Sequence, residues 1–569
     1  MRVLFLVSAH NSLSQRADIA LTEMGHDVSV AVVDSADDMR AAVAHGQPEL
    51  IVCPFLKKLI PESIWSRYRC LVVHPGPRGD RGPSSLDWAI ELGVDEWGVT
   101  VLEANGEPDA GDIWAGRTFA TREAGKSSLY RHEVRRAAVE AIVEAVGKLA
   151  SGAAPEALDY RDAAVTGRPR PLMQQATRAI EWDADATDVV LRKIRAGEGH
   201  PGVLDTIEGT PFHLFGAHRE QALRGEPGEI IAQRDDAICR ATTDGAVWIT
   251  HLKEPDAYKL PATRALALAG HEVAAPRADV ALDAPLDVYR EIAYEERDGV
   301  GYLHFDFYNG AMSTTQCRRL RQAYAYARSR HQTKVIVLMG GADFFSNGIH
   351  LNVIEAADDP SIESWWNLLA IDDVVRDIVE TDSHMVISAL AGDAAAGGVP
   401  FALAADHVLA REDVVLNPYY QHMGGLYGSE YWTYLLPRRV GDEATARLTS
   451  APFTAVGARE AVEIGLLDAA FGSSVESFRA EVRRMAQRLA ADREIPWLLG
   501  DKRRRRAADE RVKPLVAYRK EELVRSHACF FGPDRSYHEA RRRFVSKTGA
   551  PCVVAPTRAL PDAVTALAR

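Results

Sequence analysis

The opening of the chain alternates short apolar runs with segments of helical periodicity, and this alternation restricts the fold most. The runs 3–7, 28–33, 50–53 and 70–74 predict buried strands, and 13–24 between the first two predicts a helix that ends before Gly25. Alternating units of this length predict a doubly wound, mostly parallel α/β sheet. Ligands of such sheets bind beyond the carboxyl ends of the strands, and His74 lies at the end of the fourth run.

The length of 569 residues predicts three or four domains, an α/β and α+β multidomain chain. We assign residues 1–170 to the doubly wound domain. Short strands broken by glycine predict a small β-barrel over 171–262, and 263–285 is rich in Ala and Pro, as expected of a linker. Residues 286–569 form the last domain, which opens with a hairpin signal at Asp298-Gly299 and ends in helical sequence.

Composition excludes several classes of function. A net charge of −13 argues against a nucleic-acid-binding protein. The apolar run 1–7 is too short for a secretory leader and no run of 18 apolar residues exists, so we expect a cytoplasmic protein without a membrane span. The six cysteines are scattered without a CxxC pair, so neither a metal site nor a disulfide framework is expected. The basic run 502–506 is typical of a solvated helix face, with contact to a polyanion as the alternative.

The loop after the fourth strand carries the first candidate chemistry. His74 enters a loop of Pro, Gly and Arg, and Asp109 opens the sequence Asp-Ala-Gly-Asp further along the chain. An imidazole with a carboxylate partner can transfer a proton at neutral pH and stabilise the charge of a tetrahedral intermediate. The alternative is a strand-end histidine bonded to a backbone carbonyl, beside an ordinary Asp-Gly turn. Spacing alone does not separate these two interpretations.

Two glycine-rich loops past the midpoint carry the second candidate chemistry. The stretches 341–348 and 392–398 each follow an apolar strand, at 335–339 and 386–390. Backbone amides in such loops are fixed before reaction and do not titrate, so they suit the stabilisation of a thioester oxyanion. The alternative is a pair of ordinary turns between strands and helices.

Residues 1 to about 260 resemble the 10-formyltetrahydrofolate transferase and hydrolase superfamily. The matching stretch runs from Val72-Val-His74-Pro through Arg81-Gly-Pro-Ser-Ser-Leu-Asp-Trp88 and is followed by Asp109-Ala-Gly-Asp112, then by Arg192-Lys-Ile-Arg195 and His200-Pro-Gly202 of the second domain. The resemblance implies that His74 and Asp109 flank the formyl carbon of 10-formyltetrahydrofolate. It implies folate contacts at Arg81, Gly82, Ser84, Ser85 and Asp112. Val72 occupies the family's Asn position and cannot donate a hydrogen bond, which argues against plain methionyl-tRNA formylation.

Residues 286 onward resemble the crotonase superfamily, whose fold is a ββα spiral. Asn309-Gly-Ala-Met-Ser313, Phe345-Ser-Asn-Gly348 and Gly392–Gly398 carry the likeness. It implies a coenzyme A site with an oxyanion hole at the amides of Ser346 and Gly397. The implied coenzyme A contacts are Asn309, Ala311, Gly348, Gly398, Phe544 and Lys547.

The catalytic carboxylates of the hydratases are replaced in this chain. Their two positions correspond to Pro400 and Tyr419, so ordinary hydration of an enoyl-CoA is not expected. Tyr419, Tyr420 and Glu430 are the polar groups left for proton transfer. A tyrosine with its ordinary pKa can donate to a carbonyl but needs a perturbed pKa to act as a base.

The pairing of the two halves resembles the maturation factors of aerobic [NiFe]-hydrogenases that form carbon monoxide, the HypX/HoxX family. The stretches 79–88 and 417–434 are more specific to it than to either superfamily at large. The resemblance implies formyl transfer from 10-formyltetrahydrofolate to coenzyme A, then release of carbon monoxide from formyl-CoA. Expected partners are other maturation proteins or the hydrogenase large subunit. Two alternatives stay open: a folate deformylase fused to a separate acyl-CoA hydratase or isomerase, and a non-catalytic carrier of folate and coenzyme A.

Overall fold

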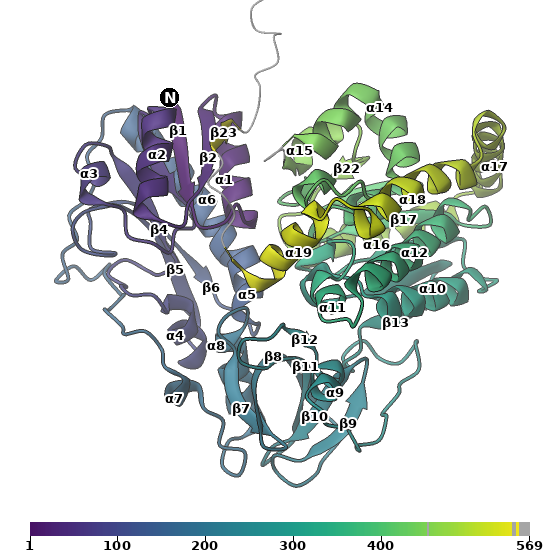
Figure 1. Cartoon of the computed structure of the whole chain (residues 1–569), viewed down its shortest axis with the longest axis horizontal. Helices are drawn as coiled ribbons and strands as arrows, with labels where there is room; N and C mark the ends of the chain where they lie inside the picture. The colour runs from purple at the N-terminus through teal and green to yellow at the C-terminus, as the bar shows by residue number, and fades with distance from the viewer. Residues whose placement is uncertain (452–454, 549–553, 557–569) are drawn as a thin grey trace, which may run out of the picture. The chain divides into compact units, whose positions relative to one another are not determined.

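The computed structural model describes residues 1–451, 455–548 and 554–556 (Figure 1). The chain divides into two compact units. Among the described residues, unit 1 comprises 1–177, 455 and 554–556, and unit 2 comprises 178–451 and 456–548.

Unit 1 is built on a seven-stranded sheet in the order β23-β2-β1-β3-β4-β5-β6. The four strands β2, β1, β3 and β4 are parallel neighbours, whereas β5 and β6 run antiparallel. The strands are β1 (Arg2–Val7), β2 (Asp27–Val32), β3 (Leu50–Cys53), β4 (Cys70–His74), β5 (Glu96–Glu103), β6 (Ile113–Ala120) and β23 (Val554–Pro556). The predicted doubly wound sheet is confirmed, and His74 is the last residue of β4.

Helices cover both faces of this sheet, which explains why its central strands are apolar on both sides. One face of β1 and β3 packs against α1 and α6, and the other packs against α2 and α3. The helices of unit 1 are α1 (Ser12–Glu23), α2 (Ala36–Gly46), α3 (Glu62–Trp65), α4 (Ser85–Glu91), α5 (Lys126–Leu129), the π-helix η1 (Tyr130–Val134) and α6 (Arg135–Ala150).

Unit 2 begins with a six-stranded antiparallel sheet packed on α8 (Thr187–Gly197). Its strands are β7 (Val203–Ile207), β8 (Thr210–Glu220), β9 (Ile230–Arg234), β10 (Ala237–Ala241), β11 (Ala246–Lys253) and β12 (Leu260–Pro261). In the part of the chain that the structure describes, the order β7-β8-β11-β10-β9 is an open path, so the expected small barrel is corrected to an open sheet. The segment 263–285, expected as a linker, begins inside helix α9 (Ala262–Leu268), which packs into the same core.

The rest of unit 2 has the predicted spiral of strands and helices. A six-stranded sheet in the order β13-β14-β15-β17-β19-β22 lies beside a smaller sheet in the order β16-β18-β20-β21. The strands are β13 (Ile292–Arg297), β14 (Val300–Phe305), β15 (Val335–Met339), β16 (Phe344–Ser346), β17 (Met385–Leu390), β18 (Asp393–Ala395), β19 (His407–Ala410), β20 (Val415–Asn417), β21 (Val456–Gly457) and β22 (Ala469–Ala470). Asp298 and Gly299 join β13 to β14 with φ of 53° and 76°, as the hairpin signal predicts.

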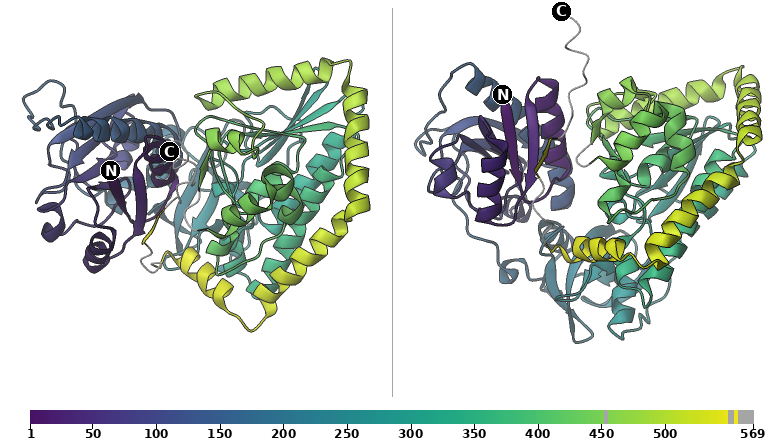
Figure 2. Two further views of the ribbon diagram at one scale, coloured as in Figure 1. Left: turned by 90° about the horizontal axis from the view of Figure 1, so that it is seen from above. Right: turned by 45° about the horizontal axis from the view of Figure 1, so that its top comes forward.

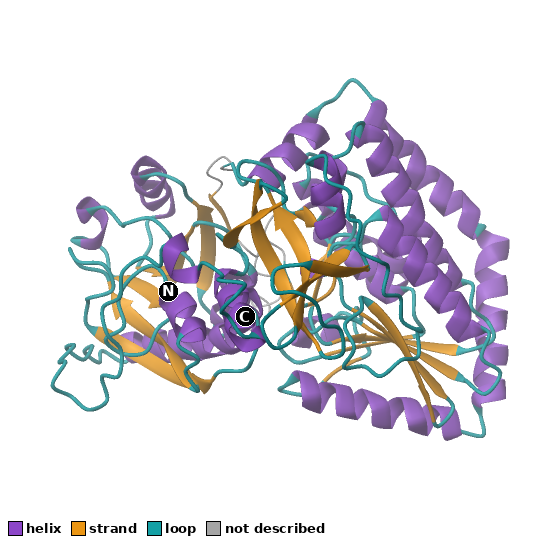
Figure 3. Ribbon diagram, turned by 90° about the horizontal axis from the view of Figure 1, so that it is seen from below, coloured by secondary structure: helices purple, strands orange, loops and turns teal. Residues whose placement is uncertain are grey.

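Helices cover both faces of the larger sheet (Figure 3). α16 packs on one face, and α10 and α12 pack on the other. The helices are α10 (Thr314–Arg328), α11 (Leu351–Glu355), α12 (Pro360–Val379), α13 (Gly398–Leu403), α14 (Trp432–Ser450), α15 (Ala458–Glu463), α16 (Val475–Ala491), α17 (Ile495–Val512), α18 (Leu515–Phe531) and α19 (Ser536–Ser546), with the 3-10 turns η2 (Tyr308–Gly310) and η3 (Tyr420–His422).

The C-terminal helices α17 and α18 run along the outside of unit 2 (Figure 2). The basic run 502–506 lies within α17, where Lys502 pairs with Asp406 at 2.5 Å and Arg505 pairs with Asp501 at 2.9 Å. Arg503, Arg504 and Arg505 are exposed, as expected of a solvated helix face, whereas Lys502 is largely buried. None of the helices described here is long and apolar enough to cross a membrane.

Candidate active sites

The first candidate site lies where β4 ends, and it contains one carboxylate more than the sequence indicated. His74 is 4% exposed, and its Nε2 lies 2.8 Å from Oδ2 of the buried Asp80, while its Nδ1 lies 3.4 Å from Oδ1 of Asp109. The structure thus brings the predicted His74 and Asp109 together. Asp80 is the residue that sequence reasoning missed, although it stands inside the matching stretch.

The loops around His74 are held by hydrogen bonds that bring distant segments together. Asp109 has φ of 53°, a left-handed conformation that is uncommon for residues other than glycine, and its Oδ2 accepts a hydrogen bond from Gly82 N at 3.2 Å. Gly167 N donates to Arg78 O, and Arg170 N donates to Arg81 O. Both bonds lay the segment before residue 171 alongside the loop that carries Asp80.

The two carboxylates determine the charge of His74. Burial by itself lowers the pKa of the ring, but the hydrogen bonds and negative charges of Asp109 and Asp80 outweigh it and raise the pKa of His74 to about 9. Burial likewise raises the pKa of Asp109, and the hydrogen bond and charge of His74 bring it below its ordinary value. At neutral pH His74 is therefore an imidazolium held between two carboxylates.

This charge state predicts how stability depends on pH. Because the pKa of His74 rises from 6.5 to about 9 on folding, its contribution is fully present below pH 6.5 and is lost as the pH rises through 9. We expect His74→Gln to lower the free energy of unfolding by up to about 3 kcal/mol more at pH 6 than at pH 10. Chemical denaturation of both chains at the two pH values checks this, and an equal difference at both would contradict it.

The predicted folate residues lie around this loop, and several already have partners within the protein. Ser84 Oγ accepts a hydrogen bond from Met173 N at 3.1 Å, and Ser85 Oγ donates to Pro75 O at 2.7 Å. Arg81 pairs with Glu107 at 2.9 Å, and the exposed Asp112 accepts a backbone bond from Glu103 N. Their role toward folate stays a prediction.

The second candidate site lies in unit 2, where the two glycine-rich loops are paired. β16 and β18 are parallel neighbours, with Ser346 opposite Ala394. A Cβ on Gly348, whose φ is 76°, would lie 3.2 Å from Gly397 N. The loops that carry Ser346 and Gly397 are therefore in direct contact, as an oxyanion hole requires.

Glu430 lies directly against the second of these loops. A Cβ on Gly397 would stand 2.3 Å from Glu430 Oε1, so glycine is needed there to admit the carboxyl group. Glu430 is 2% exposed, and its Oε2 accepts hydrogen bonds from Tyr420 OH at 2.9 Å and Ser429 N at 3.1 Å. Burial, followed by the charge of Asp372, raises the pKa of Glu430 to about 8.

Of the two neighbouring tyrosines, Tyr420 contacts Glu430. Burial, together with the charge of Glu430, raises the pKa of Tyr420 well above its ordinary value, so it is a hydrogen-bond donor rather than a base. Tyr419 is half-buried, and its N–H donates to Asn417 Oδ1 at 3.3 Å. Pro400 lies buried in α13, one turn beyond Gly397.

The predicted coenzyme A residues fall into two groups. Asn309 and Ala311 lie beside the first loop, because Asn347 Nδ2 donates to Asn309 O and Asn347 N donates to Gly310 O, both at 2.7 Å. Gly398 packs so closely on Ser346 that a Cβ would meet its carbonyl oxygen at 1.9 Å. Phe544 belongs to α19, and Lys547 caps that helix with Nζ 4.4 Å from the Phe544 ring. Their role toward coenzyme A stays a prediction.

The fold and the two sites define a protein that joins a formyltransferase-like part to a crotonase-like part. The family model for formyl transferase matches residues 31–146, the formyl transferase C-terminal domain matches 172–268, and enoyl-CoA hydratase/isomerase matches 295–524. The chain belongs to the HypX/HoxX family of hydrogenase maturation factors.

Similarity to individual proteins of this family extends over nearly the whole chain. Hydrogenase maturation factor HoxX of Bradyrhizobium diazoefficiens is 46% identical over 550 residues, which are 96% of this chain and 95% of that protein. The crystal structure of HypX from Aquifex aeolicus in complex with tetrahydrofolic acid is 42% identical, with a TM-score of 0.92 and coverage of 99% of both chains. A relative with another name matches a smaller part of the chain: a methionyl-tRNA formyltransferase of Burkholderia thailandensis is 28% identical over 239 residues, 41% of this chain and 70% of that protein.

Proposed function

We propose that this chain makes carbon monoxide for hydrogenase maturation in two steps. In the first, the formyl group of 10-formyltetrahydrofolate passes to the thiol of coenzyme A. In the second, formyl-CoA is split into carbon monoxide and coenzyme A. The match to HoxX, a hydrogenase maturation factor, and to HypX with tetrahydrofolic acid bound supports the assignment. The partner that receives the product is a hydrogenase large subunit or another maturation protein.

The first step uses the site around His74. The formyl C–N10 bond breaks, a C–S bond forms, and the thiol proton ends on the nitrogen of tetrahydrofolate. Val72 stands where related enzymes have an Asn donor, so the oxyanion of the tetrahedral intermediate needs another stabilising group. The imidazolium of His74 supplies positive charge there, and Asp80 and Asp109 keep it protonated.

The second step uses the site around Gly397. The amides of Ser346 and Gly397 polarise the carbonyl of formyl-CoA, which has no neighbouring carbon to enolise. The formyl C–H and the C–S bonds break, an S–H bond forms, and carbon monoxide leaves. Glu430 has a pKa of about 8, close to the working pH, so its carboxyl group can take up the formyl proton and return it to sulfur.

One observation carries the proposal: a buried carboxyl group touches the oxyanion loop of a crotonase-like site whose hydratase positions are Pro400 and Tyr419. Glu430 reaches Gly397 from a different segment of the chain than either of those positions. A proton-transfer group is thus retained while the geometry for adding water to a double bond is lost.

The direct test is to incubate the protein with 10-formyltetrahydrofolate and coenzyme A and to detect carbon monoxide with a haem reporter. We expect carbon monoxide only when both substrates are present. A yield no greater than that of His74→Ala would end the proposal.

Two further assays separate the alternatives. Hydration of crotonyl-CoA, with formyl release that needs no coenzyme A, would favour a deformylase fused to a separate hydratase. Binding to a hydrogenase subunit, with formyl release from the folate at background, would favour the non-catalytic carrier.

Gly76 offers a sharp test of the His74–Asp80 contact. A Cβ at Gly76 would lie 2.3 Å from Asp80 Oδ2 and 2.7 Å from His74 Nε2, so Gly76→Ala must push the pair apart. We expect formyl transfer to fall by about 10²-fold. Gly106→Ala is the matched control, because its Cβ would meet only Trp65, at 3.9 Å. Equal rates for both variants would show that the contact does not matter.

A further inference from the structure

We propose that Asp372 and Glu522 are positioning residues that hold the turn 429–433 and thereby place the Glu430 carboxyl group against Gly397. The inference rests on the proposed function for the role of Glu430 in catalysis. Neither residue touches Gly397 in the described contacts, so they act through Glu430 and its neighbours.

Asp372 binds the beginning of this turn. It lies in α12 and is fully buried. Its Oδ1 accepts a hydrogen bond from Glu430 N at 2.8 Å, and its Oδ2 accepts one from Ser429 Oγ at 2.8 Å. One carboxylate therefore fixes both the backbone of Glu430 and the side chain before it.

Glu522 binds the end of the same turn. It lies in α18 and is also fully buried. Its Oε2 accepts a hydrogen bond from Tyr431 N at 2.9 Å, and its Oε1 accepts from Thr433 N at 2.9 Å and from Thr433 Oγ1 at 2.5 Å. Two helices thus hold one short segment through two carboxylates.

The turn needs such support because its backbone is strained. Glu430 and Tyr431 have φ of 61° and 57°, in the left-handed region that bulky side chains rarely adopt. Conformations of this kind persist only where the surroundings impose them, and they are concentrated at functional sites. If residue 430 had the negative φ that is usual for a glutamate, its side chain would point away from Gly397.

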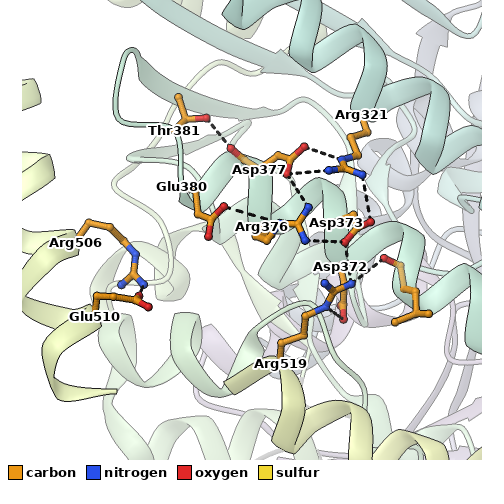
Figure 4. Close-up of polar contacts among 11 residues, drawn as sticks. Arg321, Asp372, Asp373, Arg376, Asp377, Glu380, Thr381, Arg506, Glu510 and Arg519 are labelled. Carbon is orange, nitrogen blue, oxygen red and sulfur yellow. Dashed lines mark hydrogen bonds and ion pairs between the residues drawn. The ribbon is translucent and has the colours of Figure 1, made fainter. Parts of the chain in front are cut away.

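The same arrangement controls the charge of Glu430. Arg519 pairs with Asp372 at 3.4 Å and with Asp373 at 2.8 Å, so Asp372 has a cation beside it (Figure 4). Glu430 and Glu522 are buried near that carboxylate, and burial followed by the charge of Asp372 raises the pKa of each to about 8. The ionisable groups that interact with Glu430 are Cys317 of α10, Asp372 of α12, Tyr420 of η3 and Glu522 of α18, while Arg519 of α18 acts on Asp372.

The test follows the carboxyl group of Glu430 itself. Infrared difference spectra between the full-length protein and Glu430→Gln isolate its protonated C=O band, whose intensity against pH gives a titration midpoint. In Asp372→Asn, where a neutral amide replaces the charge, we expect the midpoint to fall by about 1 pH unit. We expect release of carbon monoxide from supplied formyl-CoA to fall about tenfold, with its pH optimum displaced in the same direction.

Asp377→Asn is the matched control, because Asp377 lies in the same helix and pairs with Arg321 and Arg376 (Figure 4). Asp377→Asn should leave the titration midpoint of Glu430 and the rate of carbon monoxide release unchanged. Glu522→Gln tests the same idea through another helix, should Asp372→Asn fail to fold.

The outcomes separate the two proposals. If the titration midpoint of Glu430 is unchanged in both Asp372→Asn and Glu522→Gln, the positioning role is overturned, whatever the rate of carbon monoxide release. A displaced midpoint, together with full carbon monoxide release by Glu430→Gln, supports the positioning role and contradicts the proposed catalytic role of Glu430.

Discussion

His74→Asn should reduce formyl transfer from 10-formyltetrahydrofolate to coenzyme A by about 10³-fold. The asparagine side chain carries no positive charge, so the two carboxylates that now flank an imidazolium would face each other without a counter-ion. The tetrahedral intermediate would also lose the charge that compensates for Val72. In a single turnover, with the protein in excess over the folate donor, the sum of formyl-CoA and carbon monoxide gives the rate of this step alone.

His45→Asn is the control for this experiment, because His45 is exposed on α2 in the same unit. It should transfer the formyl group at the native rate. Carbon monoxide release from supplied formyl-CoA should be unaffected in both variants. A His74→Asn protein that transfers formyl at the native rate would contradict the assignment of the first step.

Glu430→Gln should reduce carbon monoxide release from formyl-CoA by at least about 10²-fold, while formyl-CoA still forms. Glutamine can keep the hydrogen bonds from Tyr420 and Ser429, so the loop should retain its shape. The amide cannot accept and return a proton. Formyl-CoA, or formate from its hydrolysis, should therefore accumulate, and chromatography of the thioester fraction measures it.

Tyr419→Phe is the control for the second step. The hydroxyl group that contacts Glu430 belongs to Tyr420, so removal of the Tyr419 hydroxyl group should leave the rate within about threefold of native. A large loss in Tyr419→Phe and none in Glu430→Gln would transfer the catalytic role to Tyr419.

Much of the fold could be predicted from local patterns in the sequence. Apolar runs separated by helical periods predict the parallel strands of unit 1, and Asp298-Gly299 predicts the hairpin between β13 and β14. The open sheet of unit 2 could not be predicted from the sequence. Whether short antiparallel strands close into a barrel depends on the pairing of β7 with β9, and no local pattern determines that pairing.

The candidate sites could be predicted from the sequence where one segment carries the chemistry. His74, Ser346 and Gly397 each follow a strand in a recognisable stretch. Asp80 was missed although it lies six residues after His74, since its contact depends on a tight turn at Gly76. The available signal was an acidic residue inside a loop of glycine and proline.

The roles of Asp372 and Glu522 could not be predicted from the sequence in the same way. They reach Glu430 and its neighbours from helices 58 and 91 positions away in the sequence. Each is an acidic residue on the buried side of its helix, and helical periodicity can reveal such a residue but not its partner.

The small strand β23 has a consequence for how the protein is made. It pairs with β2 at the edge of the unit 1 sheet, with Ala555 opposite Val30, yet the ribosome adds it only after the whole crotonase-like part has been synthesised. During translation, the flank of β2 that β23 later occupies has no partner strand. Unpaired strand edges attract other chains, so nascent polypeptides of this protein should depend on chaperones more than the formyltransferase-like part alone would suggest.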